Sequence, residues 1–192
     1  MRALAAPPTN VRERDMNALA VMAALGMAGF ANPASAGPAP VPSPLSAATL
    51  AHLKVLYRQL IDAENRHDIG AVRPMIWDSS TTLFVAKTAT AAEGNWAGFW
   101  GKEVVLKHFQ DLYVRTFVMD PDYSQERVVG LSRDVAETYV PLHISVAYAG
   151  QTGTPKPFLM IVDWVKTPSG WKLATDIALP IPPAPSTTGP KP

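Results

Sequence analysis

Cysteine is absent from the 192 residues of this chain. A disulfide framework and a lipid-modified cysteine are therefore both excluded. Internal repeats are absent as well, and biased composition is confined to the proline-rich ends. A chain of this length without repeats is expected to form one domain around a single core, with tails.

The chain also lacks an excess of charge of one sign. There are 17 Lys and Arg residues against 16 Asp and Glu residues, a formal net charge of +1. No run of Lys or Arg occurs, whereas nucleic acids and anionic membranes require clustered positive charge. We therefore expect no nucleic-acid partner, and an uncharged or small organic ligand fits the composition better.

No apolar run is long enough to cross a bilayer, which takes about 20 residues. The run from Ala18 to Phe30 follows three arginines and precedes a small-residue Ala-Ser-Ala site at 34–36. This order predicts a signal peptide over residues 1–36, a periplasmic or secreted location, and no stable membrane association after cleavage. A retained anchor and a start at Met16 stay open as alternatives. The arginines are Arg2, Arg12 and Arg14.

Proline, with 19 residues, is concentrated near the two ends. Residues 37–45 alternate Pro with small residues and are predicted to form an extended linker. Residues 180–192 have too little apolar surface to pack and are predicted to be a disordered tail. The folded domain is then expected over residues 46–179.

Within this domain, helical spacing of apolar residues predicts three helices. The first runs from Ser46 or Thr49, either of which can cap it, to about Arg66. Asp68 can cap a short second helix that reaches about residue 76 and that Pro74 bends or delays. A third helix is predicted over residues 102–114.

Strand patterns dominate the rest of the domain. One strand is predicted at 81–87, a loop at 88–101, and four further strands at 123–131, 135–148, 158–166 and 171–179. Along the 135–148 strand, the set that includes Ala136, Val140 and Ile144 should face the core. Pro141 cannot donate to a ladder, so a bulge there is expected, and it would decide which way His143 points.

Helices first and an antiparallel meander afterwards indicate an α+β fold. The order of a helix, His67-Asp68-Ile69, a short helix ending at Trp77, a strand, a helix led by Gly101, and a closing strand from Gly170-Trp171 resembles the nuclear transport factor 2-like superfamily and its SnoaL-like group, over residues 46–179. The resemblance implies a strongly bent, mainly antiparallel, cone-shaped sheet (cystatin-like) covered by three helices from the N-terminal half. It also implies a pocket at the open end of the cone, and a homodimer.

The resemblance further implies where catalytic groups of related enzymes would stand. In ketosteroid isomerases of this fold, the tyrosine and the base aspartate correspond to Leu60 and Phe84 here. The aspartate of the dehydratases corresponds to Asn65, which cannot act as a general base. The residues of both activities are therefore missing.

Three other residues are candidate catalytic groups. Asp163 and Asp176 lie in otherwise apolar strands, and burial in the pocket would raise their pKa and prepare them as acid or base. A solvated position at a sheet edge or dimer face is the alternative for Asp163. His143 faces outward by strict alternation and inward if a bulge forms at Pro141.

Aromatic residues supply the candidate ligand pocket, in which rings near the mouth would suit an aromatic or polycyclic ligand. The pocket residues expected are Tyr57, Phe84, Trp77, Trp96 and Trp100. Glu64-x-x-His67 resembles one half of a carboxylate-bridged metal motif, but no second copy exists, so a solvated helix end and no metal are expected. His52 and His108 are expected at the surface, and no cofactor is expected.

The sequence thus predicts an exported SnoaL-like protein that binds a small, largely apolar organic molecule. Two alternatives remain open. One is an acid–base enzyme, an isomerase, cyclase or dehydratase, that uses a buried carboxylate. The other is a dimeric interaction module without a ligand.

Overall fold

The computed structural model describes residues 43–87 and 98–182. The predicted signal peptide, most of the linker, Trp96 and nearly all of the tail lie outside these ranges. The helices are α1 (Ala47–Asn65), α2 (Ile69–Val72) and α3 (Lys102–Tyr113), with 3₁₀ turns η1 (Arg73–Met75) and η2 (Tyr123–Gln125). The strands are β1 (Leu83–Ala86), β2 (Phe99–Trp100), β3 (Phe117–Pro121), β4 (Arg127–Gly130), β5 (Val135–Val146), β6 (Lys156–Thr167) and β7 (Gly170–Pro180).

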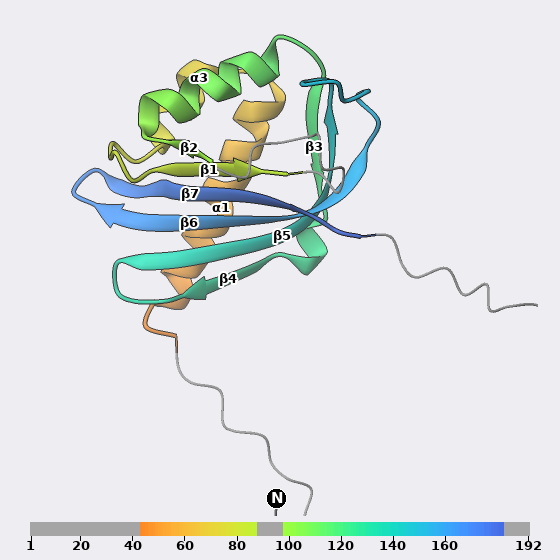
Figure 1. The fold of residues 1–192 in the computed structure, drawn as a ribbon. Helices are drawn as coiled ribbons and strands as arrows, with labels where there is room; N and C mark the ends of the chain where they lie inside the picture. The colour runs from red at the N-terminus through yellow and green to blue at the C-terminus, as the bar shows by residue number, and fades with distance from the viewer. Residues whose placement is uncertain (1–42, 88–97, 183–192) are drawn as a thin grey trace, which may run out of the picture. The chain divides into compact units, whose positions relative to one another are not determined.

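The strands form one seven-stranded sheet in the order β2-β1-β7-β6-β5-β3, with β4 also paired to β5. Neighbours are antiparallel, except that β1 runs parallel to β7. The sheet curls, so that β3 stands steeply against β1 and β7 while α1 crosses one face (Figure 1). The predicted α+β fold with a strongly bent, mainly antiparallel sheet and three helices is confirmed.

Local capping explains why α1 and α2 occupy these residues. The Ser46 side chain accepts a hydrogen bond from the Thr49 amide at 3.1 Å and starts α1. At its end, His67 has φ 57°, and the amides of His67 and Asp68 donate to the carbonyls of Glu64 and Ala63. This pair of hydrogen bonds is a Schellman motif. Both predicted helix starts are confirmed, because Asp68 Oδ1 accepts from the Ala71 amide at 3.0 Å and caps α2.

The strand prediction missed two strands and misplaced part of a third. β2 lies within the expected 88–101 loop, and β3 was not expected at all. The strand expected at 123–131 is η2 followed by β4. β3 alternates as a strand, with Phe117 and Met119 buried, and it pairs with the second half of β5. β3 has only five residues and ends in Pro121, so its alternation of buried and exposed residues is too short to indicate a strand in the sequence.

β5 keeps one register with β6 from Val135 to Ile144, straight through Pro141. The expected bulge at Pro141 is therefore wrong: Pro141 pairs with Leu159, and its carbonyl accepts from the Asp122 amide at 2.8 Å. The irregularity lies instead between β6 and β7, where the register shifts between Asp163 and Trp164. Trp164 pairs with Leu173 and Asp163 with Thr175, so that β7 carries one extra residue.

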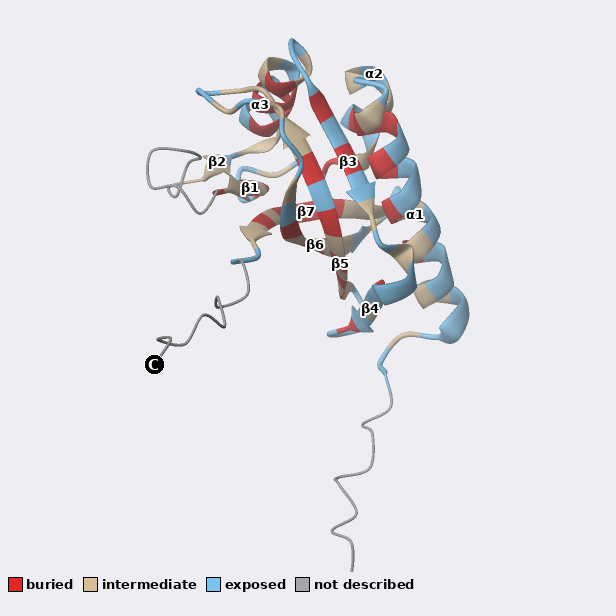
Figure 2. Cartoon of the chain, turned by 90° about the vertical axis from the view of Figure 1, so that its right-hand side faces the viewer, coloured by how far each residue is buried: buried red, intermediate tan, exposed pale blue. Residues whose placement is uncertain are grey.

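The core lies between the inner face of the sheet and the helices, and buried residues recur along the strands on that face (Figure 2). Trp164 is fully buried at one end of it, and its indole N–H donates to Thr138 Oγ1 at 2.9 Å. Leu53 and Tyr57 of α1 pack there without exposed surface. Each large apolar side chain buried in this way contributes about 1.5–3 kcal/mol. In the described ranges, no helix combines the length and the apolar character that a membrane span needs.

Candidate functional site

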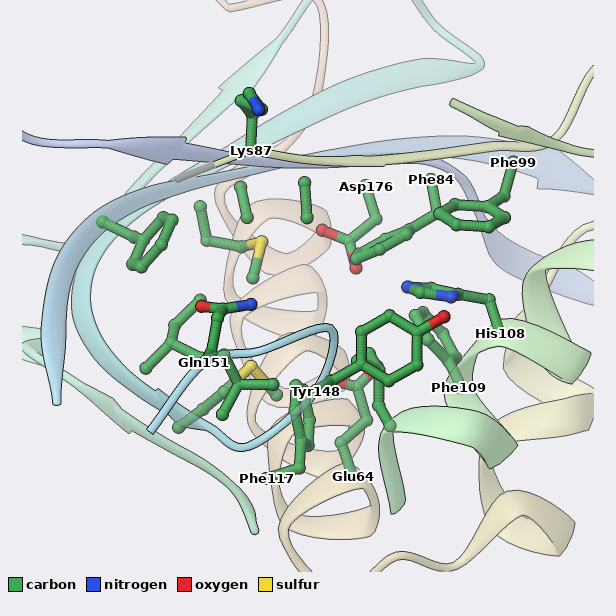
Figure 3. A pocket seen from close by; sticks show the side chains of 18 of the residues that line it. Glu64, Phe84, Lys87, Phe99, His108, Phe109, Phe117, Tyr148, Gln151 and Asp176 are labelled. Carbon is green, nitrogen blue, oxygen red and sulfur yellow. The ribbon is translucent and has the colours of Figure 1, made fainter. Parts of the chain in front are cut away.

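A cavity of about 240 Å³ lies on the inner face of the sheet, between the strands, the end of α1 and α3. Most of its wall is apolar, and several aromatic rings face it (Figure 3). Its polar lining residues are Glu64, Lys87, His108, Tyr148, Gln151 and Asp176. Its apolar lining residues are Phe84, Ala86, Phe99, Phe109, Leu112, Phe117, Met119, Ile144, Val146, Ala149, Phe158, Met160 and Ala178.

Two carboxyl groups reach this cavity from opposite walls. Asp176 comes from β7, beside Phe84 of β1 and Val162 of β6, and Glu64 comes from the last turn of α1 (Figure 3). Each residue is only 2% exposed. Asp176 Oδ1 and Glu64 Oε1 are both buried without a hydrogen-bond partner among the described residues. A buried oxygen without a hydrogen-bond partner costs free energy. Both carboxyl groups would therefore be stabilised by a proton or by a ligand that donates hydrogen bonds.

Burial sets the protonation of this pair. It raises the pKa of Asp176 from 3.8 to about 7. Burial first, and then the charge of Asp176, raise the pKa of Glu64 well above its ordinary 4.5. Two carboxyls that share a dry site cannot both ionise cheaply, so the pair holds at least one proton near neutral pH. Asp176 can then give or take a proton there, as a general acid or base must.

His108 of α3 faces the cavity from a stack of aromatic rings. Its imidazole lies against Phe99 with ring centroids 3.7 Å apart and an interplanar angle of 15°. Phe84 and Tyr148 are the next rings, with centroids 5.2 and 5.4 Å from His108. Burial lowers the pKa of His108 from 6.5 to about 4. The ring is therefore neutral at physiological pH and offers the cavity a hydrogen bond without a charge.

Two tyrosine hydroxyls complete the polar surroundings of the carboxyl pair. The Tyr57 and Tyr113 hydroxyls are buried without partners among the described residues. Burial, and then the charges of Asp176 and Glu64, raise the pKa of Tyr57. Burial and the same two charges, with that of Glu64 the larger, raise the pKa of Tyr113. Both phenols therefore stay protonated and can act as neutral donors.

Of the three predicted catalytic residues, only Asp176 lies in the cavity. Asp163 is on the other face of β6, because the inner face is formed by Phe158, Met160, Val162 and Trp164. There Asp163 pairs across strands with Glu137. His143 is exposed on the outer face of β5, since no bulge at Pro141 turns it inward. Asp163 and His143 thus take the outward positions that the sequence left open for them, and of the three candidates only Asp176 can act in the cavity.

Of the five predicted pocket residues, Phe84 lines the cavity. Tyr57 does not, because its position on α1 buries it in the core, edge-on to Tyr123. Trp77 instead fixes the start of β7, where its amide donates to the Leu173 carbonyl at 2.8 Å. Trp100 is 55% exposed and points away from the core. Trp96 is outside the described residues.

Glu64 and His108 were expected at the surface and instead line the cavity. A signal for both was present in the helical spacing. Glu64 follows Tyr57, Leu60 and Ile61 at the intervals of one helix face, and His108 lies three residues after Val105. A polar residue at a core position of an amphipathic helix is the observation that would have found them.

The end of α1 is bound to β3 by two side chains. Asn65 Nδ2 donates to the Met119 carbonyl at 2.8 Å, and Asn65 Oδ1 accepts from the Met119 backbone amide at 2.7 Å. His67 Nε2 lies 2.9 Å from the Phe117 carbonyl, and its ring stacks on Tyr113. Asn65 and His67 are thus structural. In residues 43–87 and 98–182, no three His, Asp or Glu side chains form a cluster that could hold a metal ion.

Several solved structures share this fold. A nuclear transport factor 2-like superfamily protein from Salmonella enterica superposes with a TM-score of 0.60 at 12% identity, over 75% of this chain and 99% of that one. An NTF2-like protein from Pseudomonas putida superposes with a TM-score of 0.55 at 15% sequence identity, over 70% of this chain and 88% of that one. A ketosteroid isomerase-like protein from Erwinia carotovora superposes with a TM-score of 0.54 at 18% sequence identity, over 72% of this chain and 100% of that one.

No family model and no curated protein matches the sequence. Identities of this size establish the fold and leave the activity open. The nuclear transport factor 2-like fold predicted from the order of motifs is confirmed.

Proposed function

We propose that this chain, which has the nuclear transport factor 2-like fold, binds a small, largely apolar organic molecule in the cavity on the inner face of its sheet. The supporting observation is a cavity of about 240 Å³ with a mainly apolar, partly aromatic wall and a few polar groups. This combination is typical of small-molecule sites. Sites for drug-sized ligands start near 300 Å³, and a benzene ring fits roughly 150 Å³, so the ligand has one or two rings.

A melting-temperature screen of the full chain against hydrophobic and aromatic carbonyl compounds tests this proposal. A ligand at about 100 times its Kd adds roughly 2.7 kcal/mol of stability, which raises the Tm by about 5 °C or more for a chain of this size. Hits should be lost in Ala178→Phe, which fills the cavity from β7. They should survive in Leu179→Phe, whose side chain lies on the other face of the same strand.

Two outcomes would contradict ligand binding in this cavity. One is a screen without any hit. The other is a set of hits that Ala178→Phe leaves unchanged, because such ligands would bind elsewhere. If Ala178→Phe does not fold, Ala86→Phe fills the same cavity from β1 and replaces it in the comparison.

A second candidate function is acid–base catalysis by an isomerase, cyclase or dehydratase. The observation in its favour is the pair of buried carboxyls, one of which has a pKa of about 7 inside an apolar cavity. Similar folds include the ketosteroid isomerase-like protein and a candidate dehydratase from Streptomyces avermitilis, the latter with a TM-score of 0.55 at 14% identity. Leu60 and Phe84 stand where the isomerase groups would be, so the carboxyl bases that the described lining offers are Asp176 and Glu64.

Proton exchange distinguishes an enzyme from a carrier. A bound ketone incubated with the protein in D₂O should gain deuterium beside its carbonyl, as followed by NMR, and Asp176→Asn should abolish the gain while binding persists. Binding without deuterium incorporation in the wild type would leave the carrier function alone.

We also infer that the protein is exported and forms a homodimer. Support for export is the basic start, the 18–30 apolar run and the small-residue site at 34–36. Mass spectrometry of the protein from its native cell should find a chain that starts at Gly37. Support for a dimer is the outer face of the sheet, where Leu159, Ile161 and Ile177 remain partly exposed. Light scattering should give twice the chain mass, and a monomer would remove the dimer and the interaction-module alternative.

A further inference from the structure

We propose that the ligand of this cavity carries an ammonium group, which binds between Glu64 and Asp176 while its hydrocarbon body contacts the aromatic wall. This inference rests on the proposed ligand binding and adds the chemical class of the ligand. Among the residues that the structure describes, three lining side chains have an oxygen that is buried without a partner. These atoms are Glu64 Oε1, Asp176 Oδ1 and Gln151 Oε1.

All three unpartnered atoms are hydrogen-bond acceptors once the carboxyls are ionised. A primary ammonium has three N–H donors and no acceptor, so two of its donors can bind the carboxylate oxygens of Glu64 and Asp176 and the third is free for another acceptor of the site. Its charge also compensates two carboxylates that would otherwise repel each other in a dry site. Charge-assisted hydrogen bonds of this kind are about twice as strong as neutral ones.

The rings around the carboxyl pair favour a cation as well. Phe84, Phe99, Phe109 and Tyr148 face the same cavity as Asp176 and Glu64 (Figure 3). Phe84, the neighbour of Asp176 on the sheet, meets Phe109 of α3 edge to face, with ring centroids 5.1 Å apart. Aromatic faces attract cations, and more so when water is excluded. An anionic ligand would meet two carboxyls and gain nothing from these rings.

The cationic side chains in residues 43–87 and 98–182 do not take this place. Figure 3 shows the Lys87 side chain directed away from the carboxyl pair, on the other side of the strands. His108 is neutral because burial lowers its pKa to about 4. The other titratable groups that the structure describes near the pair are phenols: Tyr57 on α1, Tyr113 on α3 and Tyr148 after β5.

Binding of an ammonium group should therefore release a proton from the carboxyl pair. The carboxyls must be ionised to hold it, so the affinity should rise as the pH rises from 5 to 8, while an aliphatic amine stays protonated throughout. A neutral ligand that accepts a hydrogen bond from a protonated carboxyl shows the reverse trend. The sign of the pH dependence thus separates the two ligand classes.

Calorimetric titration of the full chain with matched amine and alcohol pairs tests the proposal. The pairs are benzylamine and benzyl alcohol, 2-phenylethylamine and 2-phenylethanol, and 2-(1-naphthyl)ethylamine and its alcohol, with 3-phenylpropanoate as the anion. At pH 8, at least one amine should bind about tenfold more tightly than its alcohol. The anion should not bind, and the amine should bind more weakly at pH 5.

Variants assign the effect to the two carboxyls. Asp176→Asn and Glu64→Gln should each weaken amine binding by about tenfold or more and leave the alcohol within about threefold. Asp163→Asn, on the outer face, is the matched control and should change neither. If the alcohols bind as tightly as the amines, the ammonium proposal is overturned and the apolar cavity stands. If none of the six compounds binds, the ammonium proposal fails, and the melting-temperature screen with Ala178→Phe decides separately whether the cavity binds an apolar ligand.

Discussion

Two pairs of acidic residues lie on opposite faces of the same sheet. On the outer face, Glu137 of β5 is directly across from Asp163 of β6. On the inner face, Asp176 of β7 points at Glu64 of α1. Asp163 and Asp176 are on the neighbouring strands β6 and β7. Asp163 pairs with Thr175, the residue before Asp176, and Asp176 pairs with Val162, the residue before Asp163.

The comparison separates residue type from environment. Both pairs place two carboxyls close enough to influence each other, and partial burial followed by a hydrogen bond with Asp163 raises the pKa of Glu137. Glu137 and Asp163 are nevertheless partly exposed, so water screens them. The inner pair is 2% exposed at each residue. Only there does the protein itself have to hold the proton or bind a compensating charge.

Of the substitutions that test this difference between the two faces, Asp176→Asn should have the largest effect on the free energy of unfolding. Because the folded pKa of about 7 exceeds the unfolded 3.8, the native state binds the proton more tightly, and the wild type loses stability as pH rises from about 4 to 7. The variant has no charge to bury. Its stability relative to the wild type should therefore grow by about 4 kcal/mol from pH 4 to pH 8.

Urea unfolding followed by fluorescence at the two pH values measures this difference, without ligand present. An Asp176→Asn variant whose advantage is the same at both pH values would show that Asp176 has the same pKa in the folded and the unfolded protein. The inner carboxyls would then not differ from the outer ones.

His108→Phe should give the next largest effect, with the opposite sign. Burial lowers the folded pKa of His108 to about 4 against 6.5, so the unfolded chain takes up the proton first and the wild type loses stability as pH falls from about 6.5 to 4. Phe cannot be protonated and fits the stack on Phe99. From pH 8 to pH 5, the variant should gain about 2 kcal/mol relative to the wild type.

The same urea titrations provide the check on His108. A constant difference between variant and wild type would mean that the pKa of His108 is the same in the folded and the unfolded protein, so that the folded ring is protonated below about pH 6.5. A cationic ring beside Asp176 would then remove the reason for an ammonium ligand.

The smallest effect belongs to the outer pair. At protein concentrations low enough to keep the chain monomeric, Glu137→Gln and Asp163→Asn should each change the free energy of unfolding by no more than about 0.5 kcal/mol, because partly exposed charges contribute little. A change of several kcal/mol in either variant would show that another surface covers this face, and the same experiment repeated at a tenfold lower protein concentration would identify a dimer by the change in Tm.

Most of the fold was accessible from the sequence because helix starts and long alternating strands are local signals. Ser46 and Asp68 cap the helices they were expected to cap, and the inward set of β5 is the predicted one. The short strands β2 and β3 were missed because their pairing is decided by distant partners. The order of motifs still sufficed for the fold, since it does not depend on each short strand.

The site was accessible only in part. Asp176 was found because a carboxylate in an apolar strand is conspicuous, but Asp163 has the same signature and lies outside. Alternation within one strand cannot say which face is the inner one, since that depends on the neighbouring strands and helices. Glu64 was misplaced because the charged residues around it suggested a solvated helix end, although its helical register placed it inward.

The extra residue in β7, Ala174, bears on how this site can change in evolution. Ala174 lies between Leu173, paired with Trp164, and Thr175, paired with Asp163. It lets Leu173 and Asp176, three residues apart, both face inward. Loss of one residue at this point would shift the strand by one position and exchange its two faces. Insertions and deletions at the bulge, more than substitutions in the cavity, can therefore give this scaffold an acid or take it away.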